Sequence, residues 1–164
     1  MSLDFLTGSS GVNNQSDDKL IGKDKEQVIR FSVTEDGIES TFNFTDQGKV
    51  PGLFNEIGDG GTYDAVLLYS GKQVGTASAD FELVKQLGND SFIADVKDIL
   101  KFNDGSTLTI EGNLNVQKFE NLQPAQLDIT SGTGVFEGAK GKATFTQNES
   151  GVLDVINIDV QAIV

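Results

Sequence analysis

The stretch QVGTASADFELVKQ, residues 73–86, alternates apolar and polar side chains, and this alternation decides the fold class. One face of the stretch carries Ala77, Ala79, Phe81 and Leu83. The opposite face carries Thr76, Ser78, Asp80 and Glu82. A period of two residues is that of a β-strand with one dry face and one wet face. The stretch therefore predicts a strand that covers an apolar interior.

The same pattern recurs in short segments separated by turn residues, at 27–34, 38–44, 62–69, 73–86, 91–102, 106–116, 125–130, 141–147 and 152–161. No stretch shows helical periodicity over three turns. Strands at this regular spacing favour a sandwich or a barrel. Residues 1–26 are rich in Gly, Ser, Asn and Asp, and we expect them to form an irregular N-terminal arm in front of one β domain at 27–164.

The composition of the 164 residues limits the chemistry. The net charge of −13 repels nucleic-acid phosphates and anionic lipid headgroups, so we expect neither nucleic acid nor a membrane as a partner. The chain has no Cys and no His, which excludes disulfides, thiolate nucleophiles and imidazole catalysis. Carboxylates, Lys, Arg, Tyr and hydroxyl groups remain. We expect no metal and no cofactor, although Asp side chains could still bind a hard cation.

The sequence also bears on localisation. No apolar run approaches the roughly 20 residues that a membrane span needs. The first residues, Met1 to Leu6, lack the basic region and the long apolar region of a secretory signal. We therefore expect a cytoplasmic protein, with export without a leader as the alternative.

Three motifs are more specific than generic β-structure. Gly58-Asp59, followed by Leu68-Tyr69, Gly71 and Val74-Gly75, resembles the first half of the allene oxide cyclase barrel. DGSTLTIEG at 104–112 is similar to a hairpin strand of the same superfamily, and DITSGTGVFEGAKG at 128–141 resembles a glycine signature that the cyclases share with the dirigent proteins. The glycines themselves are expected to let the chain turn tightly between strands, so this motif indicates a fold and not an activity.

The resemblance implies a closed eight-stranded antiparallel β-barrel that forms homodimers or homotrimers, with an interior that suits side chains or one small ligand. Segment 62–69 is apolar on both faces, which is consistent with contact to a partner subunit. Members of the superfamily cyclise unstable fatty-acid epoxides, steer radical coupling or accelerate ring closure in polyketide pathways.

The polar residues of the plant cyclase are not retained. Laid over this sequence, they fall at or near Phe31, Val33, Val66 and Phe81, which are all apolar and which we expect on the dry face. Allene oxide cyclisation itself is therefore not expected. Lys140 stands where dirigent proteins usually carry Arg, and a flexible point charge does not reproduce a bidentate contact.

Three carboxylates, Asp64, Asp98 and Asp154, share the parity of apolar neighbours. A carboxylate in an apolar cavity resists ionisation and can act as an acid or a base near neutral pH. Asp64 and Asp98 are the predicted catalytic residues, and Asp98 is the better candidate because it lies in the middle of its segment. The alternative is that these acids sit at strand ends, where the barrel opens to water.

The predicted function is a small cyclase or isomerase of specialised metabolism that folds a hydrophobic reactive intermediate for stereoselective ring closure. The predicted substrate-binding residues all belong to apolar faces: Ile29, Phe31, Val33, Val66, Leu68, Ala79, Phe81, Leu83, Leu108 and Ile110. One alternative is a non-catalytic dirigent-like or carrier protein for a small hydrophobic ligand. Another is a solid barrel, its interior filled by Phe side chains, that acts through its surface.

Overall fold

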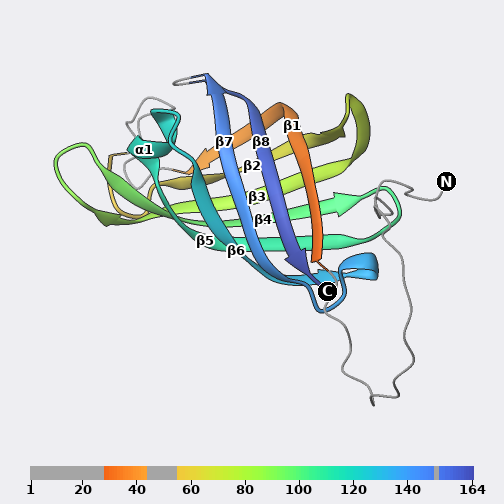
Figure 1. Cartoon of the computed structure of the whole chain (residues 1–164). Coiled ribbons are helices and arrows are strands. Elements are labelled where there is room, and N and C mark those ends of the chain that lie inside the picture. Colours follow the sequence, from red (N-terminus) through yellow and green to blue (C-terminus); the bar gives the residue numbers. More distant parts are fainter. Residues whose placement is uncertain (1–27, 44–54, 150–151) are drawn as a thin grey trace, which may run out of the picture.

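The computed structural model describes residues 28–43, 55–149 and 152–164 of the chain. Eight antiparallel strands make one closed barrel (Figure 1). The strands are β1 (Val28–Asn43), β2 (Gly60–Tyr69), β3 (Lys72–Gln86), β4 (Phe92–Phe102), β5 (Thr107–Asn115), β6 (Ala125–Thr133), β7 (Lys140–Glu149) and β8 (Val152–Ile163). The predicted fold class is confirmed. The N-terminal arm predicted at 1–26 lies outside the described residues.

Each strand pairs with its neighbours in sequence, and the ring closes because β1 also pairs with β8. The contact between β1 and β8 runs from Val28 opposite Ile163 to Asp36 opposite Val155. Closure leaves no unpaired sheet edge and gives every strand an inner face and an outer face. The alternation along β3 follows this division, with Ala77, Ala79 and Leu83 buried inside.

Strand β1 corrects one boundary of the sequence analysis. The predicted segments 27–34 and 38–44 are parts of a single strand, whose register shifts between Asp36 and Glu39. Gly37 lies at this irregularity with φ of +64°, a backbone conformation that glycine adopts without a steric penalty. A bulge of this kind bends a strand without ending it. The residues at this point are typical of a turn, which is why the sequence analysis divided one strand into two segments.

Strand β2 corrects the parity that the sequence analysis gave it. Ala65 and Leu67 are buried inside the barrel, whereas Val66, Leu68 and Asp64 belong to the outer face. Both faces of this strand are apolar, so alternation could not fix the register, and a one-residue error turns every side chain over. The predicted interior positions of Asp64, Val66 and Leu68 are therefore wrong. Contact between β2 and a partner subunit stays a prediction.

One half of the barrel is packed with aromatic side chains. The rings of Phe31, Phe102 and Phe136 meet with centroid distances of 5.8, 5.7 and 5.1 Å. Phe136 belongs to the short 3-10 helix η2 (Gly134–Phe136), which follows β6 at this end. A Cβ atom on Gly132 would overlap the Phe136 carbonyl oxygen. The glycine signature thus allows the close approach that closes this end of the barrel.

The hairpin motif and the glycine signature meet at the same end. Ser106 is buried, and its hydroxyl accepts a hydrogen bond from the Val135 backbone N–H at 3.1 Å. The same hydroxyl donates to Oδ2 of Asp104 at 2.9 Å. Gly134 has φ of +62°, and a Cβ atom there would overlap the Ser106 hydroxyl. These contacts confirm the architectural role expected of the glycine motif.

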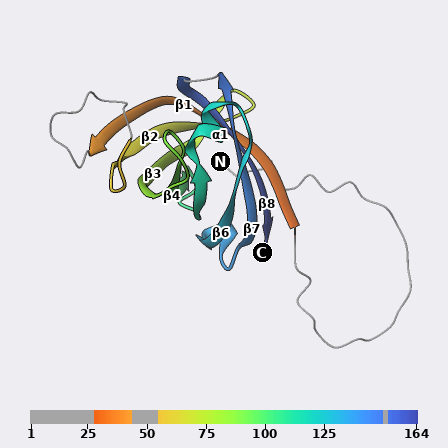
Figure 2. The ribbon, with the colours of Figure 1, turned by 90° about the vertical axis from the view of Figure 1, so that its left-hand side faces the viewer.

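The opposite end of the barrel carries the one-turn helix α1 (Val116–Glu120), and this end faces the viewer in Figure 2. Asn115 caps this helix, because its side chain accepts a hydrogen bond from the Lys118 N–H at 3.0 Å. Phe119 is buried and places the helix against the barrel. In the part of the chain that the structure describes, no helix has the length and apolarity that a membrane crossing requires.

Candidate functional site

A pocket of about 110 Å³ occupies the α1 half of the barrel. Most of its lining side chains are apolar and come from the inner faces of seven strands and from α1: Tyr63, Phe81, Leu83, Ala94, Val96, Leu114, Val116, Phe119, Glu120, Leu127, Phe145 and Ile156. The two halves of the interior therefore differ, since one is filled by phenylalanine and the other is hollow. Pockets with apolar walls and a few convergent polar groups are typical of small-molecule sites.

Two polar residues line the pocket, the exposed Glu120 and, deeper in the barrel, Tyr63. Its hydroxyl lies 3.3 Å from Oδ2 of Asp98, which is fully buried. The two residues come from β2 and β4, and the residue between them on β3 is Ala79. Because Ala79 has a small side chain, the tyrosine can reach the carboxylate across it. On β4, Asp98 follows Ala94 and Val96, which both line the pocket.

Glu35 is the second buried carboxylic acid of the interior, with no exposed surface. Burial raises its pKa well above the usual range, and the nearby Asp98 raises it further. Burial also raises the pKa of Asp98, to about 6, although interactions with Glu35 and Tyr63 oppose the shift. Glu35 is consequently the acid that retains its proton at neutral pH.

Gln147 completes the polar part of the interior and is only 3% exposed. It pairs with Ile156 on β8, and Ile156 pairs in turn with Glu35 on β1. Gln147 and Glu35 therefore flank a residue that lines the pocket. Neither the amide nitrogen nor the amide oxygen of Gln147 has a hydrogen-bond partner of normal geometry. The same holds for both Glu35 oxygens and for Oδ1 of Asp98, although the Glu35 and Asp98 carboxyls are close enough to interact. Buried polar atoms usually have partners, so their absence needs an explanation.

This arrangement offers proton donors and an acceptor beside an apolar chamber. Burial raises the pKa of Tyr63, and the carboxylates of Asp98 and Glu35 raise it further, so its hydroxyl stays protonated. Tyr63, which lines the pocket, can donate a hydrogen bond to a substrate oxygen when Asp98 is protonated and does not accept the tyrosine proton. Asp98, with a pKa of about 6, can accept or return a proton close to neutral pH.

The structure brings some of the predicted residues to the pocket and leaves others away from it. Phe81 and Leu83 line the pocket, and Ala79 and Ile110 are the cross-strand neighbours of Asp98. The predicted interior position of Asp98 is confirmed, while its catalytic role stays a prediction. Four further predicted residues are buried in the core but do not line the pocket: Ile29, Phe31, Val33 and Leu108.

The remaining predicted residues do not reach the interior. Val66 and Leu68 lie on the outer face, and Asp64 is exposed there, where it accepts a hydrogen bond from the Ser78 hydroxyl. The side chain of Asp154 lies outside the described residues.

Sequence reasoning missed Glu35 and Gln147 and assigned Tyr63 to neither face of its strand. Each of them continues an inward parity: Glu35 follows Ile29, Phe31 and Val33, Gln147 follows Ala143 and Phe145, and Tyr63 precedes Ala65 and Leu67. The signal was present in the alternation. It was lost because a predicted segment ended one residue before Glu35 and because a polar residue was taken to end a dry face.

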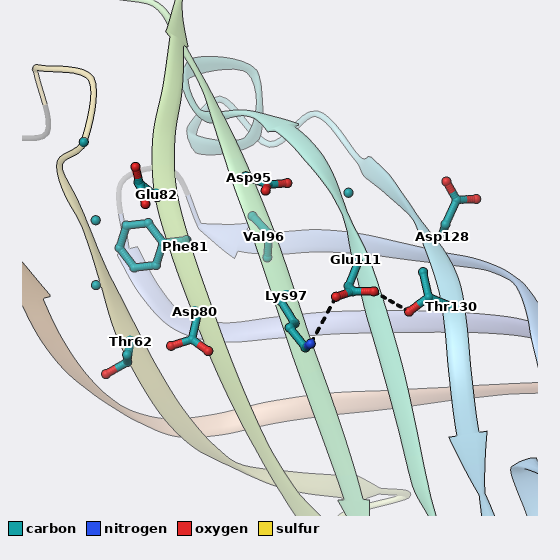
Figure 3. A pocket seen from close by; sticks show the side chains of 14 residues that line it. Thr62, Asp80, Phe81, Glu82, Asp95, Val96, Lys97, Glu111, Asp128 and Thr130 are labelled. Atoms are coloured by element: carbon teal, nitrogen blue, oxygen red, sulfur yellow. Dashed lines mark hydrogen bonds and ion pairs between the residues drawn. The ribbon is translucent and has the colours of Figure 1, made fainter.

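A second, larger hollow lies on the outer surface of β2 to β6 (Figure 3), with a volume of about 710 Å³. Its floor is partly glycine, and its walls carry the outward side chains Thr62, Asp80, Glu82, Asp95, Lys97, Glu111, Asp128 and Thr130. Among the residues with described positions, no cluster of acidic side chains is close enough to hold a metal ion.

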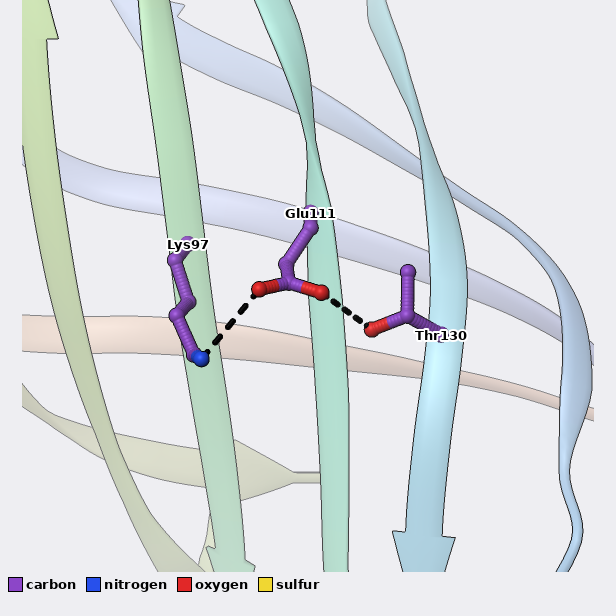
Figure 4. Close-up of polar contacts among 3 residues, drawn as sticks. All are labelled: Lys97, Glu111 and Thr130. Carbon is purple, nitrogen blue, oxygen red and sulfur yellow. Dashed lines mark hydrogen bonds and ion pairs between the residues drawn. The ribbon is translucent and has the colours of Figure 1, made fainter.

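The main polar contact in this outer groove joins three strands (Figure 4). Nζ of Lys97 lies 3.2 Å from Glu111, which accepts a hydrogen bond from the Thr130 hydroxyl at 2.6 Å. These contacts lower the pKa of Glu111. The side chains of Lys97 and Glu111 are 51% and 39% exposed, so water screens their interaction. The outer groove therefore lacks the desolvated groups of the inner pocket, which is the stronger candidate site.

Comparison with protein families matches residues 38–153 to the allene oxide cyclase barrel like domain. A comparison with curated proteins gave no match.

Several solved structures have the same barrel. A pterocarpan synthase dirigent protein shares 17% identity with a TM-score of 0.68, over 92% of this chain and 98% of its own. The Diels Alderase AbmU from Streptomyces koyangensis shares 17% sequence identity with a TM-score of 0.65, and the match covers 82% of this chain and 63% of AbmU. A pyocyanin demethylase shares 16% sequence identity with a TM-score of 0.64, and the match covers 80% of this chain and 98% of the demethylase. At these identities the likeness shows the fold alone.

Proposed function

The chain belongs to the allene oxide cyclase barrel-like family, and from this premise we propose that it is a cofactor-independent cyclase or isomerase acting on a small hydrophobic intermediate. The observation that carries the proposal is the apolar pocket with the Tyr63 hydroxyl in its wall, 3.3 Å from buried Asp98. The barrel supplies shape, and the buried acids supply the proton chemistry.

Most of the catalysis in this proposal is positional. A flexible substrate enters the α1 half and is held between the aromatic and aliphatic walls formed by residues such as Phe81, Leu83 and Phe145. Holding reacting atoms in one geometry can lower a barrier by roughly 7–11 kcal/mol. Ring closure needs little more than this, because both reacting ends belong to one molecule.

The polar residues have separate roles in the proposal. When Asp98 is protonated it donates to the Tyr63 oxygen, which leaves the Tyr63 proton to bond the substrate oxygen on which negative charge develops. Asp98 orients the tyrosine and exchanges a proton with it, while neutral Glu35 keeps a second negative charge out of the interior. General acid–base assistance of this kind typically contributes about 10²–10⁴-fold to a rate.

The test is turnover by the purified protein alone on a panel of polyenes and epoxides, with the products separated by chiral chromatography. We expect one stereoisomer to be enriched over the uncatalysed mixture. Asp98→Asn should lose at least about tenfold in rate, whereas Asp64→Asn, which changes an exposed acid on the outer face, should match the unaltered protein. Equal loss in both variants, or none in either, would remove the acid–base role.

A dirigent-like or carrier function is the second candidate. It is favoured by the match to the dirigent protein structure over nearly the whole length of both chains. A protein of this kind would produce nothing alone, but it would change the stereochemistry of the product that a partner oxidase releases. Adding the protein to such an oxidase and measuring the enantiomeric ratio separates this function from that of a cyclase.

A further inference from the structure

We propose that the inner pocket takes a hydrophobic amine, whose apolar part lies inside the barrel and whose protonated nitrogen lies at the mouth of the pocket beside Glu120. The proposal rests on the proposed function, in which this pocket holds a small hydrophobic molecule. It goes further because it assigns the chemical class of the ligand and the end of the pocket at which the polar group lies. It also gives a role to Glu120, which the proposed function does not use.

The burial of the lining residues gives the pocket a closed end and an open end. Leu83 and Leu127, in the strands, are each 1% exposed, whereas Glu120, the last residue of α1, is exposed. Helix α1 lies between the end of β5 and the start of β6, at the rim of the barrel. A ligand in the pocket therefore has its inner end among apolar side chains and its outer end beside Glu120.

The size of the pocket limits the apolar part of the ligand. A dry cavity of about 150 Å³ holds benzene, so a pocket of about 110 Å³ has room for one small ring at most. The ring would lie against Phe119 of α1 and Phe145 of β7, which both line the pocket. Because the ring takes up the available volume, a polar substituent on it lies at the open end.

The charge at the open end is negative. Among the described residues that line the pocket, Glu120 is the only one with a charged side chain. Partial burial raises the pKa of Glu120, because the ionised carboxylate has lost part of its hydration. A protonated amine would donate a charge-assisted hydrogen bond to this carboxylate and offset that loss. A ligand carboxylate at the same place would be repelled.

The charge behind the inner wall has the same sign. Tyr63 separates the pocket from Asp98, which has a pKa of about 6 and is therefore mostly ionised at pH 7. The buried polar side chains in the described part of the chain include no Lys or Arg that would balance this charge. Charges act over a distance through an apolar interior, so no contact between the ligand and Asp98 is needed. Both ends of the pocket thus favour a cation over an anion.

The experiment measures the binding of three one-ring probes to the full chain at pH 7, by titrations followed in the NMR spectrum of the protein. Benzylamine is a cation, benzyl alcohol is its neutral counterpart of the same shape, and benzoate is an anion. The dissociation constant of benzylamine should be about fivefold lower than that of benzyl alcohol, as expected for one ion pair at a partly exposed acid. Benzoate should bind at least about tenfold more weakly than benzylamine, since the same charge attracts one probe and repels the other.

Three variants locate the effect. Glu120→Gln keeps the size of the side chain and removes its charge, so it should reduce the preference for benzylamine over benzyl alcohol to less than about twofold. Asp90→Asn removes the same charge from the exposed turn between β3 and β4 and should leave the preference intact, which separates Glu120 from the net charge of −13. Ala94→Leu fills the pocket and should abolish the binding of both probes. Glu120 and Asp90 are exposed, so their variants should fold.

The outcomes separate this inference from the proposed function. Equal binding of benzylamine and benzyl alcohol, a preference for the amine that survives Glu120→Gln, or binding of none of the three probes overturns the inference. The proposed function would still stand if the protein enriched one cyclised stereoisomer of a neutral polyene or epoxide. A preference for the amine that is lost in Glu120→Gln and kept in Asp90→Asn supports the inference, even if no substrate is turned over. In that case the pocket would select amines without being the site of a cyclase.

Discussion

The Tyr63 hydroxyl and Oδ2 of Asp98 lie 3.3 Å apart, although β2 and β4 are not neighbouring strands. They meet over Ala79, the residue of β3 that pairs with both. A larger side chain at this position would stand between the two groups. The small residue on the dry face of β3 thus permits the polar contact, and the pKa of Asp98 depends on it.

Replacing Tyr63 should change the proton affinity of Asp98. The hydrogen bond from Tyr63 lowers the pKa of Asp98, which burial has raised to about 6. In Tyr63→Phe this pKa should therefore rise further, because the carboxylate loses a donor while the site stays apolar. Carbon-13 NMR titration of the aspartate carboxyl signals measures the change. Tyr69→Phe, at the far end of β2, is the control, and an Asp98 pKa that stays or falls in Tyr63→Phe would contradict the assignment.

Folding stability should depend on pH through the same acids. Asp98 has a pKa of about 6 in the folded protein and an ordinary value of 3.8, so above pH 4 the folded state holds more protons than the unfolded chain. The free energy of unfolding therefore falls as pH rises through this window, by roughly 3 kcal/mol from Asp98. The raised pKa of Glu35 acts in the same direction.

Urea unfolding at pH 4.5 and at pH 7.5 measures this effect as the difference between variants. In Asp98→Asn the free energy of unfolding should fall less between pH 4.5 and pH 7.5 than it does in the unaltered protein. Asp95→Asn, an exposed acid of the same strand, is the control. If Asp98→Asn steepened the loss of stability toward high pH, the sign of the proposed shift would be wrong.

The alternation of single strands predicted most of the fold but not all of the site. On β3 and β4 one face is polar and the other apolar, so parity placed Leu83 and Asp98 correctly inside. On β2 the outward Val66 and Leu68 are as apolar as the inward Ala65 and Leu67, and only pairing with Thr76 and Gly75 fixes the register. A register set by neighbouring strands is not visible in the strand itself.

Glu35 shows a different limit of the sequence. It continues the inward parity of β1, yet acids are rarely buried, so composition argued against it. Burial and the nearby Asp98, which is distant in sequence and lies across two strands, raise the pKa of Glu35 and so favour its neutral form, which costs less to bury. Buried polar groups of this kind break the local rule that defines a dry face, and sequence patterns alone therefore miss them.

The glycine signature should be sensitive to a single methyl group. A Cβ atom on Gly132 would overlap the carbonyl oxygen of Phe136, which is backbone and cannot move independently. Gly132→Ala should therefore destabilise the fold by about 1–3 kcal/mol or more, measured by urea unfolding. Gly88→Ala is the control, because a Cβ atom there meets nothing within 4 Å. Equal stability of the two variants would mean that the signature is not under steric constraint.

The two halves of the interior should respond in opposite ways to added volume. Ala94 lines the pocket of about 110 Å³, whereas Ala162 is fully buried and pairs with Ile29 and Gly141 toward the η2 end. Ala94→Leu can place its extra carbons in the pocket, so stability should change by less than about 1 kcal/mol, while overpacking at Ala162→Leu should cost about 1–3 kcal/mol. Ala94→Leu should also abolish binding of a small hydrophobic ligand, because it fills the pocket. Urea unfolding and calorimetry measure both effects, and a similar loss of stability in the two variants would show that the α1 half is packed as tightly as the other.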